Sequence, residues 1–396
     1  MRYSRFGRTE LQMPAITCGG MRFQQSWNAE DSISEESQAN LEACVQRALQ
    51  VGVNHFETAR GYGTSEEQLG RILPSLPRDE MIVQTKIGPN DDAEEFRRQF
   101  EDSLGRLKLD HVDLLALHGI NDDEGLRRAT EVGCVDVARE LVKDGKVRFV
   151  GFSTHGDADL IQKVVETDRF DFVNLHYFYI SQEKRRVIEA ANGLDMGVFI
   201  ISPCDKGGML YSPPDKLVEL CRPLTPMKFN DVWTLASAPV HTLSIGAARP
   251  SDFDEHVEAM AEWDEMQGSA MEVAQRLDAE MGRVLGAEWM AHWRENLPKW
   301  HETPGEINIP IILGLWNIAK AFDMIEYGRM RYNLMGNGGS WFPGYKADKL
   351  VTGEVTDGQL LEVLEGHPDP KRVLAALREA DELLAGEEKK RLSEGG

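Results

Sequence analysis

The sequence lacks several features that would place it in a specialised class of protein. It has five cysteines among 396 residues, none in a C-x-x-C spacing and none after residue 221, so it indicates neither a disulfide framework nor a metal site. Its most apolar stretch, residues 307–319, is interrupted by two asparagines and a proline, whereas a membrane span needs about 20 apolar residues. The opening MRYSRFGRTE has no apolar core of the kind found in a signal peptide. We therefore expect a cytoplasmic protein with reduced thiols and no membrane partner.

Positive charge is also scarce. The chain carries 44 lysines and arginines against 66 aspartates and glutamates, which gives a formal net charge of −22. Nucleic acids and anionic membranes bind basic surfaces, so neither is an expected partner. Any ligand that bears a phosphate would need cations supplied locally.

Short apolar runs alternate with longer amphipathic segments from about residue 14 to residue 260. The runs are rich in Val, Ile, Leu and Phe, as strands buried on both faces are. They cover residues 14–19, 54–58, 81–87, 112–118, 147–154, 172–177, 198–202 and 242–246. Helices are expected over residues 65–73, 92–107, 123–143, 157–166, 183–191 and 227–238. This alternation predicts an α/β protein built as a closed (β/α)8 TIM barrel, and a doubly wound open sheet is the competing arrangement.

The alternation stops after about residue 250. Beyond that point Met271, Ala274, Leu277 and Met281 recur at helical spacing, which indicates one long amphipathic helix or two. We predict two domains: a barrel over residues 1–260 and a mostly helical C-terminal extension over residues 261–396.

Four side chains with acid–base chemistry fall at or just after the C-terminal ends of three expected strands. These are Glu57, Tyr62 in the following loop, Lys86 and His118. In a (β/α)8 barrel the functional groups gather at these strand ends. A lysine cation next to a tyrosine lowers the pKa of the phenol, and a carboxylate keeps that lysine charged. Lowering the pKa by about three units requires roughly 4 kcal/mol of differential interaction. The set suits proton delivery to a carbonyl oxygen that receives a hydride.

Each of these residues also has a structural interpretation. Glu57 and Lys86 could form an ion pair that closes the mouth of the barrel. His118 could be a satisfied buried histidine, and Tyr62 could pack over a turn. Their joint placement on consecutive strand ends is the informative observation.

Residues 52–66, which read GVNHFETARGYGTSE, resemble the signature G-[IV]-N-x-[FI]-D-T-A-x-x-Y-G-x-S-E of the aldo-keto reductase family. Further stretches resemble other family segments in the same order, namely CGGM at 18–21, VQTK at 83–86, DLLALH at 113–118, GFST at 151–154, and IGAAR at 245–249 followed by DEH at 254–256. The resemblance covers about residues 1–260.

This resemblance implies an NADP-dependent carbonyl reductase that binds NADPH, with NADH as the less frequent choice. No G-x-G-x-x-G fingerprint occurs, so the dinucleotide would bind without a Rossmann domain. The resemblance makes Tyr62 the proton donor, Lys86 its partner, Glu57 the carboxylate that orients Lys86, and His118 the residue that polarises the carbonyl. It assigns the cofactor to Gly20, Met21, Ser153, Asn174, Ser202, Gly246, Arg249, Glu255 and His256. Within this set Ser153 and Asn174 would bind the carboxamide, and Arg249 would bind the ribose phosphate.

The chain departs from the family pattern at three positions of this site. Glu57 stands where the family has aspartate, which moves the carboxylate by about 1.5 Å. Asn174 stands where glutamine is usual, and Ile201 replaces an aromatic residue that often stacks on the nicotinamide. These departures motivate an alternative interpretation, a nucleotide-binding regulatory protein with a decayed reductase site.

The C-terminal extension resembles that of a subgroup with ferredoxin-like cysteines. Residues 303–310 read TPGEINIP and residues 341–347 read WFPGYKA, similar to C-P-x-G-[IV]-x-I-P and W-x-P-G-x-x-A. Because an iron–sulfur cluster needs several thiolates and no cysteine follows residue 221, we expect a version of this extension without an iron–sulfur cluster. The expected partner is a small-molecule carbonyl substrate, and the sequence leaves open a monomer or a homo-oligomer.

Overall fold

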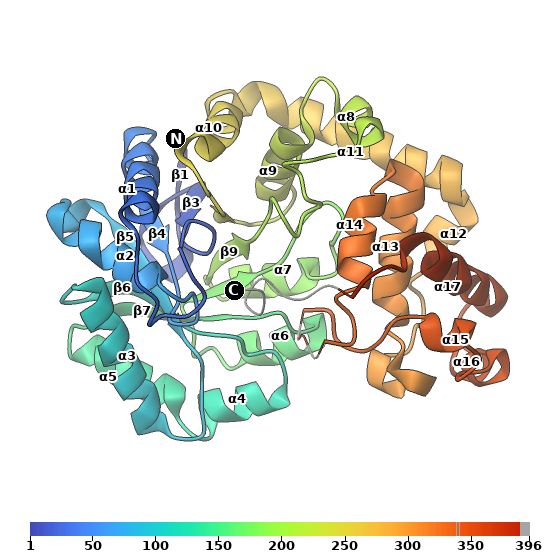
Figure 1. Ribbon diagram of the computed structural model, residues 1–396, viewed down its shortest axis with the longest axis horizontal. Helices are drawn as coiled ribbons and strands as arrows, with labels where there is room; N and C mark the ends of the chain where they lie inside the picture. The colour runs from blue at the N-terminus through green and yellow to red at the C-terminus, as the bar shows by residue number, and fades with distance from the viewer. Residues whose placement is uncertain (338, 340, 389–396) are drawn as a thin grey trace. The chain divides into compact units, whose positions relative to one another are not determined.

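Eight parallel strands close into a barrel in the computed structural model of the protein, which describes residues 1–337, 339 and 341–388 (Figure 1). The strands are β3 (Ile16–Gly19), β4 (His55–Glu57), β5 (Ile82–Ile87), β6 (Val112–Leu117), β7 (Val147–Ser153), β8 (Phe172–Leu175), β9 (Gly197–Ile201) and β10 (Thr242–Ile245). Each pairs with the next in sequence, and β10 returns to pair with β3. This order confirms the predicted (β/α)8 barrel and excludes the open sheet.

Helices alternate with these strands along the chain. They are α1 (Glu35–Gln50), α2 (Ser65–Ile72), α3 (Ala93–Leu107), α4 (Asp123–Thr130), α5 (Cys134–Lys143), α6 (Ala158–Glu166), α7 (Arg185–Gly193), α9 (Pro226–Ser237) and α10 (Asp254–Ala261). The single helix expected over residues 123–143 is wrong, because the chain breaks into α4 and α5 there. Gly133, at the break, has φ of +96°, a conformation that glycine adopts at little cost and that ends a right-handed helix.

A hairpin closes the barrel at the N-terminal ends of its strands. It consists of β1 (Tyr3–Arg5) and β2 (Gln12–Pro14), which pair antiparallel. Phe6, in the turn between them, is fully buried and lies 5.9 Å from the ring of Phe172, the first residue of β8. The functional end of the barrel is therefore the opposite one, where the strands finish.

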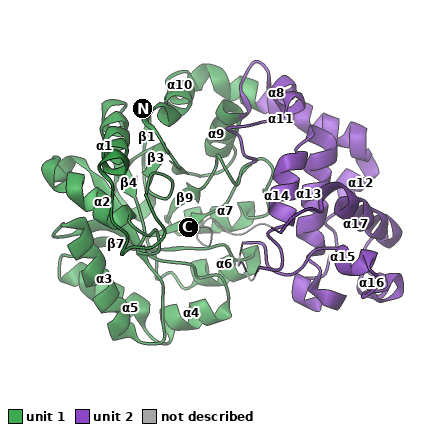
Figure 2. Ribbon diagram, in the orientation of Figure 1, with its two compact units in different colours: residues 1–207, 227–270, 396 green, residues 208–226, 271–395 purple. Residues whose placement is uncertain are grey.

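The chain divides into two compact units (Figure 2). The first contains residues 1–207 and 227–270, and the second contains residues 208–226 and 271–395. The predicted boundary at residue 260 differs from this division, which follows Ala270 and places residues 208–226 with the second unit. Residues 389–396 of the predicted extension lie outside the described part of the chain.

The second unit is helical, as predicted for the extension. Its helices are α8 (Asp215–Cys221), the C-terminal part of α11 (Trp263–Leu285), α12 (Ala287–His292), α13 (Ile309–Phe322), α14 (Ile325–Tyr332), α15 (Asp348–Val351), α16 (Asp357–Val363) and α17 (Pro370–Leu384). The two segments of the extension that resemble family motifs, residues 303–310 and 341–347, contact each other. Ile307 and Tyr345 form a parallel bridge, and the side-chain amide of Asn308 donates to the carbonyl of Pro343 at 2.7 Å.

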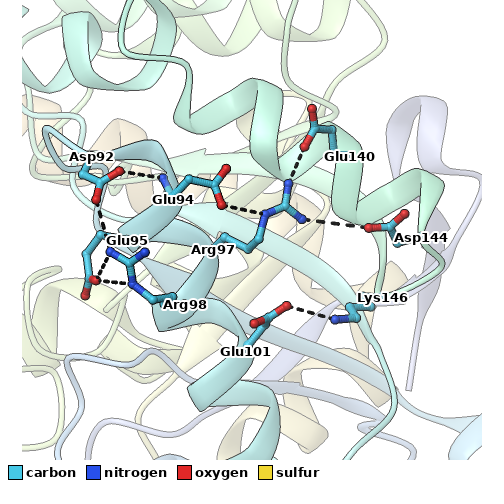
Figure 3. A network of polar contacts seen from close by, with 9 residues as sticks. All are labelled: Asp92, Glu94, Glu95, Arg97, Arg98, Glu101, Glu140, Asp144 and Lys146. Atoms are coloured by element: carbon cyan, nitrogen blue, oxygen red, sulfur yellow. Dashed lines mark hydrogen bonds and ion pairs between the residues drawn. The ribbon is translucent and has the colours of Figure 1, made fainter.

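Many surface cations of the first unit are paired with carboxylates. Around α3 and α5, Arg97 contacts Glu94, Glu140 and Asp144 (Figure 3). Arg98 and Lys146 form further pairs with acidic groups of the same network. Such exposed pairs contribute little to stability. No helix among the described residues is long and apolar enough to cross a bilayer.

Candidate active site

A buried ion pair joins the ends of β4 and β5. Glu57 is 3% exposed and Lys86 is 1% exposed, and the ammonium of Lys86 donates to Oε1 of Glu57. Oε2 of Glu57 accepts a hydrogen bond from Oγ of Ser244 in β10 at 3.0 Å. Both carboxylate oxygens of Glu57 therefore have hydrogen-bond partners, so the structure accommodates a glutamate at this position.

Lys86 connects this pair to the phenol of Tyr62. Its Nζ donates to the carbonyl of Thr58 at 2.8 Å and to the Tyr62 hydroxyl at 3.2 Å. Tyr62 sits in the short loop between β4 and α2, where the next residue, Gly63, has φ of +52°. A Cβ at Gly63 would lie 1.9 Å from the carbonyl oxygen of Ser26, so this turn requires glycine and fixes the direction of the phenol.

His118 completes the group. It follows the last residue of β6, and its imidazole lies edge-on to the Tyr62 ring with 5.8 Å between ring centroids. Trp27 packs edge-on to the same phenol at 6.3 Å. The structure thus brings together all four residues that the strand-end argument singled out.

Burial controls the protonation of this group. It lowers the pKa of His118 to about 3, with smaller contributions from Lys86 and Lys206, so the imidazole is neutral near pH 7. Burial also lowers the pKa of Lys86 well below its usual value and raises that of Tyr62. The direction for Tyr62 is opposite to the expected one, because burial removes water from the phenolate and so disfavours the charged form. The phenol is consequently in its protonated form.

Ser153 and Asn174 lie side by side at the ends of β7 and β8, where they are directly paired in register. The side-chain amide of Asn174 is fully buried, and neither its nitrogen nor its oxygen has a hydrogen-bond partner among the described residues. Oγ of Ser153 accepts from the backbone amide of Gly119 at 3.0 Å. A buried primary amide without partners is costly, and it is complementary to another amide, such as a carboxamide.

The other predicted cofactor residues of the barrel also lie at strand ends. Gly20 and Met21 follow β3, and the amide of Gly20 donates to the carbonyl of Glu57 at 2.7 Å. Ser202 follows β9 and has φ of +54°. Gly246 follows β10, and a Cβ there would lie 2.6 Å from the side chain of Arg22.

The segment after β10 holds the three remaining predicted residues, but not as one group. Arg249 has a 75% exposed side chain and pairs with Asp252 at 2.8 Å. Glu255 lies half-buried in the first turn of α10. His256 is 3% exposed, and its two ring nitrogens contact Asp231 and Cys204. Both ring nitrogens of His256 therefore have partners within the protein.

Sequence reasoning missed several groups around the site. Ser244, which binds Glu57, lies within β10 and has no motif of its own. His155, His176 and Lys206 follow β7, β8 and β9, so the strand-end rule could have found them. The rings of His155 and His176 stack at 4.7 Å, and Nζ of Lys206 lies 3.0 Å from Nε2 of His176.

Comparisons with known proteins agree with this barrel. The Arabidopsis thaliana protein L-galactose dehydrogenase is 25% identical over 286 residues, which are 64% of this chain and 88% of that protein. The NADH-specific methylglyoxal reductase of Escherichia coli is 26% identical over 189 residues, 41% of this chain and 57% of that protein. The fold matches the crystal structure of an aldo-keto reductase from Klebsiella pneumoniae in complex with NADPH, with a TM-score of 0.53 and 20% identity over 67% of this chain and 95% of that one. The family model described as Aldo/keto reductase family matches residues 15–276. This chain is thus a member of the aldo/keto reductase family.

Proposed function

We propose that the protein reduces an aldehyde or a ketone to an alcohol with a nicotinamide cofactor, and that Tyr62 delivers the proton. The observation that carries this proposal is the continuous contact from Ser244 through Glu57 and Lys86 to the hydroxyl of Tyr62. Membership of an oxidoreductase family supports it.

Each residue of the group has a chemical task in this proposal. The protonated phenol of Tyr62 donates to the carbonyl oxygen, and Lys86 stabilises the phenolate that the transfer leaves behind. Glu57 fixes the direction of the Lys86 ammonium. His118, which is neutral because burial lowers its pKa to about 3, donates a hydrogen bond that orients the carbonyl and does not compete as the acid.

The residues at the ends of β7 and β8 fit the cofactor. The partnerless amide of Asn174 and the hydroxyl of Ser153 would hold a carboxamide. When bound, a reduced nicotinamide supplies the hydride. We propose NADPH as the preferred form, because the exposed guanidinium of Arg249 offers a bidentate site for a ribose phosphate once it releases Asp252. The relatives include an NADH-specific enzyme, and the Klebsiella pneumoniae structure holds NADPH, so both cofactors occur among the proteins that this chain resembles.

The rival proposal is a nucleotide-binding regulatory protein whose reductase site has decayed. If the site had lost its function, the two buried contacts of the Glu57 carboxylate would not need to be maintained. Its two oxygens instead bind Lys86 and Ser244, which supports a working site that has adjusted to the longer side chain.

Three further features belong to the proposal. All five cysteines are free thiols, which fits the reducing cytoplasm. The paired loop motifs of the second unit support a ferredoxin-like extension that has lost its cluster cysteines. The proposed partner is a small carbonyl compound, with no role for nucleic acid or membrane.

Fluorescence titration with NADPH and then NADH, followed by a panel of aldehydes, ketones and sugars monitored by NADPH oxidation, tests this function. We expect saturable binding and turnover of at least one carbonyl class. Binding without turnover of any carbonyl would favour the regulatory alternative.

A further inference from the structure

A second set of side chains with acid–base chemistry meets where the loop after β9 approaches α9 and α10. Oδ2 of Asp231 in α9 is hydrogen-bonded to Nδ1 of His256 in α10. The other ring nitrogen of His256, Nε2, lies 3.6 Å from Sγ of Cys204 in the loop. Carboxylate, imidazole and thiol therefore stand in the order that activates a nucleophile.

The burial of these groups strengthens the electrostatic interaction between Asp231 and His256. Asp231 is fully buried and His256 is 3% exposed, whereas Cys204 is half-buried. The second carboxylate oxygen of Asp231 has no hydrogen-bond partner among the described residues, so the imidazole is its main source of stabilisation. Burial alone would neutralise His256, but the charge of Asp231 and the contact with Cys204 outweigh it and raise the pKa of His256 well above its usual value.

Cys204 differs from every other cysteine of the chain, all of which the structure describes. Cys18, Cys44, Cys134 and Cys221 are buried, and burial raises the pKa of each of these thiols. Buried thiols that stay protonated are inert, whereas a partly exposed thiol beside a cationic imidazole is reactive. The four buried cysteines are therefore internal controls for the fifth.

A metal centre is the other chemistry that cysteine, histidine and aspartate can share. Within the described ranges no group of three or more such side chains is placed to hold a metal ion. The imidazole also uses both nitrogens on Asp231 and Cys204. The geometry thus suits proton transfer between Cys204 and His256 better than joint ligation.

We propose that Cys204 is a nucleophilic thiol that exchanges with low-molecular-weight disulfides, with His256 as its base and Asp231 as the residue that positions the imidazole. In this step the Cys204 thiolate attacks one sulfur of the disulfide, and a new sulfur–sulfur bond forms as the old one breaks. The departing half leaves as a thiolate and takes the proton that His256 received from Cys204. The disulfide is the oxidant, so no other reactant is needed.

The charged groups on the packed segments define what else could affect this thiol. They are Asp205 and Lys206 in the loop, Lys228 and Asp231 in α9, and Asp254, Glu255, His256 and Glu258 in α10. Lys228 is paired with Glu258 at 2.9 Å, and Asp254 with Arg47 at 2.5 Å. His256 is the group in hydrogen-bond contact with Sγ, and we therefore expect it to dominate the pH dependence.

The test treats the full chain with oxidised glutathione at pH 7 and locates the adduct by intact mass and peptide mapping. We expect one glutathionyl group, on Cys204, which dithiothreitol removes and which Cys204→Ser does not acquire. An ordinary thiol is about 3% ionised at pH 7. Because the imidazole of His256 lies in contact with Sγ of Cys204 and can take its proton, we expect Cys204 to react about tenfold faster than an ordinary exposed thiol.

The rate of iodoacetamide alkylation at pH 7 separates activation from simple exposure. In the wild type we expect Cys204 to be alkylated about tenfold faster than an ordinary exposed thiol. His256→Gln should slow alkylation about tenfold at pH 7 and not at pH 10, and Asp231→Asn should act in the same direction. His292→Gln, at an exposed histidine of the second unit, should change nothing.

Two results would overturn the proposal: a wild-type alkylation rate at pH 7 equal to that of an ordinary exposed thiol, or a glutathionyl adduct spread over several cysteines. If circular dichroism shows that His256→Gln is unfolded, the wild-type rate decides alone. These readouts are independent of carbonyl reduction, so the proposal on Cys204 can fail or succeed separately from the proposed function.

Discussion

Shortening Glu57 to aspartate tests whether the site is built around the longer side chain. The substitution keeps the charge but withdraws the carboxylate by about 1.5 Å. The hydrogen bond from Ser244, at 3.0 Å, would then lie beyond hydrogen-bond distance, and the contact with Lys86 would lengthen as well. Because all three side chains are at least 95% buried, water cannot replace these contacts.

The magnitude follows from the lost interactions. A hydrogen bond to a charged group contributes about 1.5–3 kcal/mol, and each 1.4 kcal/mol corresponds to about a tenfold change in rate. If the lost interaction energy reduces how well the Lys86 ammonium is oriented toward Tyr62, kcat should fall by about tenfold to a hundredfold. The Kd for NADPH should change little, because Glu57 is not a proposed cofactor ligand.

The assay is steady-state carbonyl reduction followed by NADPH oxidation, with thermal unfolding measured in parallel. Ser244→Ala is the matched control, since it removes the same hydrogen bond without moving the carboxylate and should show part of the same loss. A Glu57→Asp enzyme as fast as the wild type, or faster, would refute the reasoning and favour a decayed site.

Other perturbations probe the rest of the site and the barrel. Tyr62→Phe should abolish carbonyl reduction while NADPH fluorescence titration still shows binding; unchanged turnover would rule out Tyr62 as the donor. Arg249→Ala should weaken NADPH by about tenfold or more and NADH far less, and equal losses would place the phosphate elsewhere. His55 is fully buried, and burial lowers its pKa to about 3. Below about pH 6.5 the unfolded chain therefore binds a proton that the folded one does not, so stability falls as the pH falls. His55→Gln should lose about 2 kcal/mol less than the wild type between pH 7 and pH 5, as read from urea unfolding midpoints; equal losses would contradict this.

The strands could be predicted because they are buried on both faces and their apolar runs are unambiguous. These runs suit a doubly wound sheet as well as a barrel, and the family resemblance favoured the barrel. The bounds of the helices could be predicted less well. Gly133 interrupts a segment whose apolar spacing is continuous, and the sequence does not reveal that its φ is +96°. Helix α1 was not among the expected elements, although Ser34 caps it by accepting from the amide of Ser37 and two glutamates follow.

The four catalytic candidates could be predicted from the sequence because strand ends converge in any parallel barrel. Their protonation states could not be predicted. Burial raises the pKa of Tyr62, whereas the neighbouring Lys86 was expected to lower it, and the depth of burial depends on the tertiary structure. The partners of His256 were equally hidden. Asp231 and Cys204 come from separate segments, and no local sequence pattern predicts that both contact His256.

The hairpin of β1 and β2, with the buried Phe6, closes this barrel at the N-terminal ends of its strands, within the part of the chain that the structure describes. In the proposed reaction the dinucleotide and the carbonyl compound would then both enter and leave at the C-terminal ends of the strands. Whichever binds deeper has to arrive first and leave last, so product-inhibition patterns should be those of a compulsory-order mechanism.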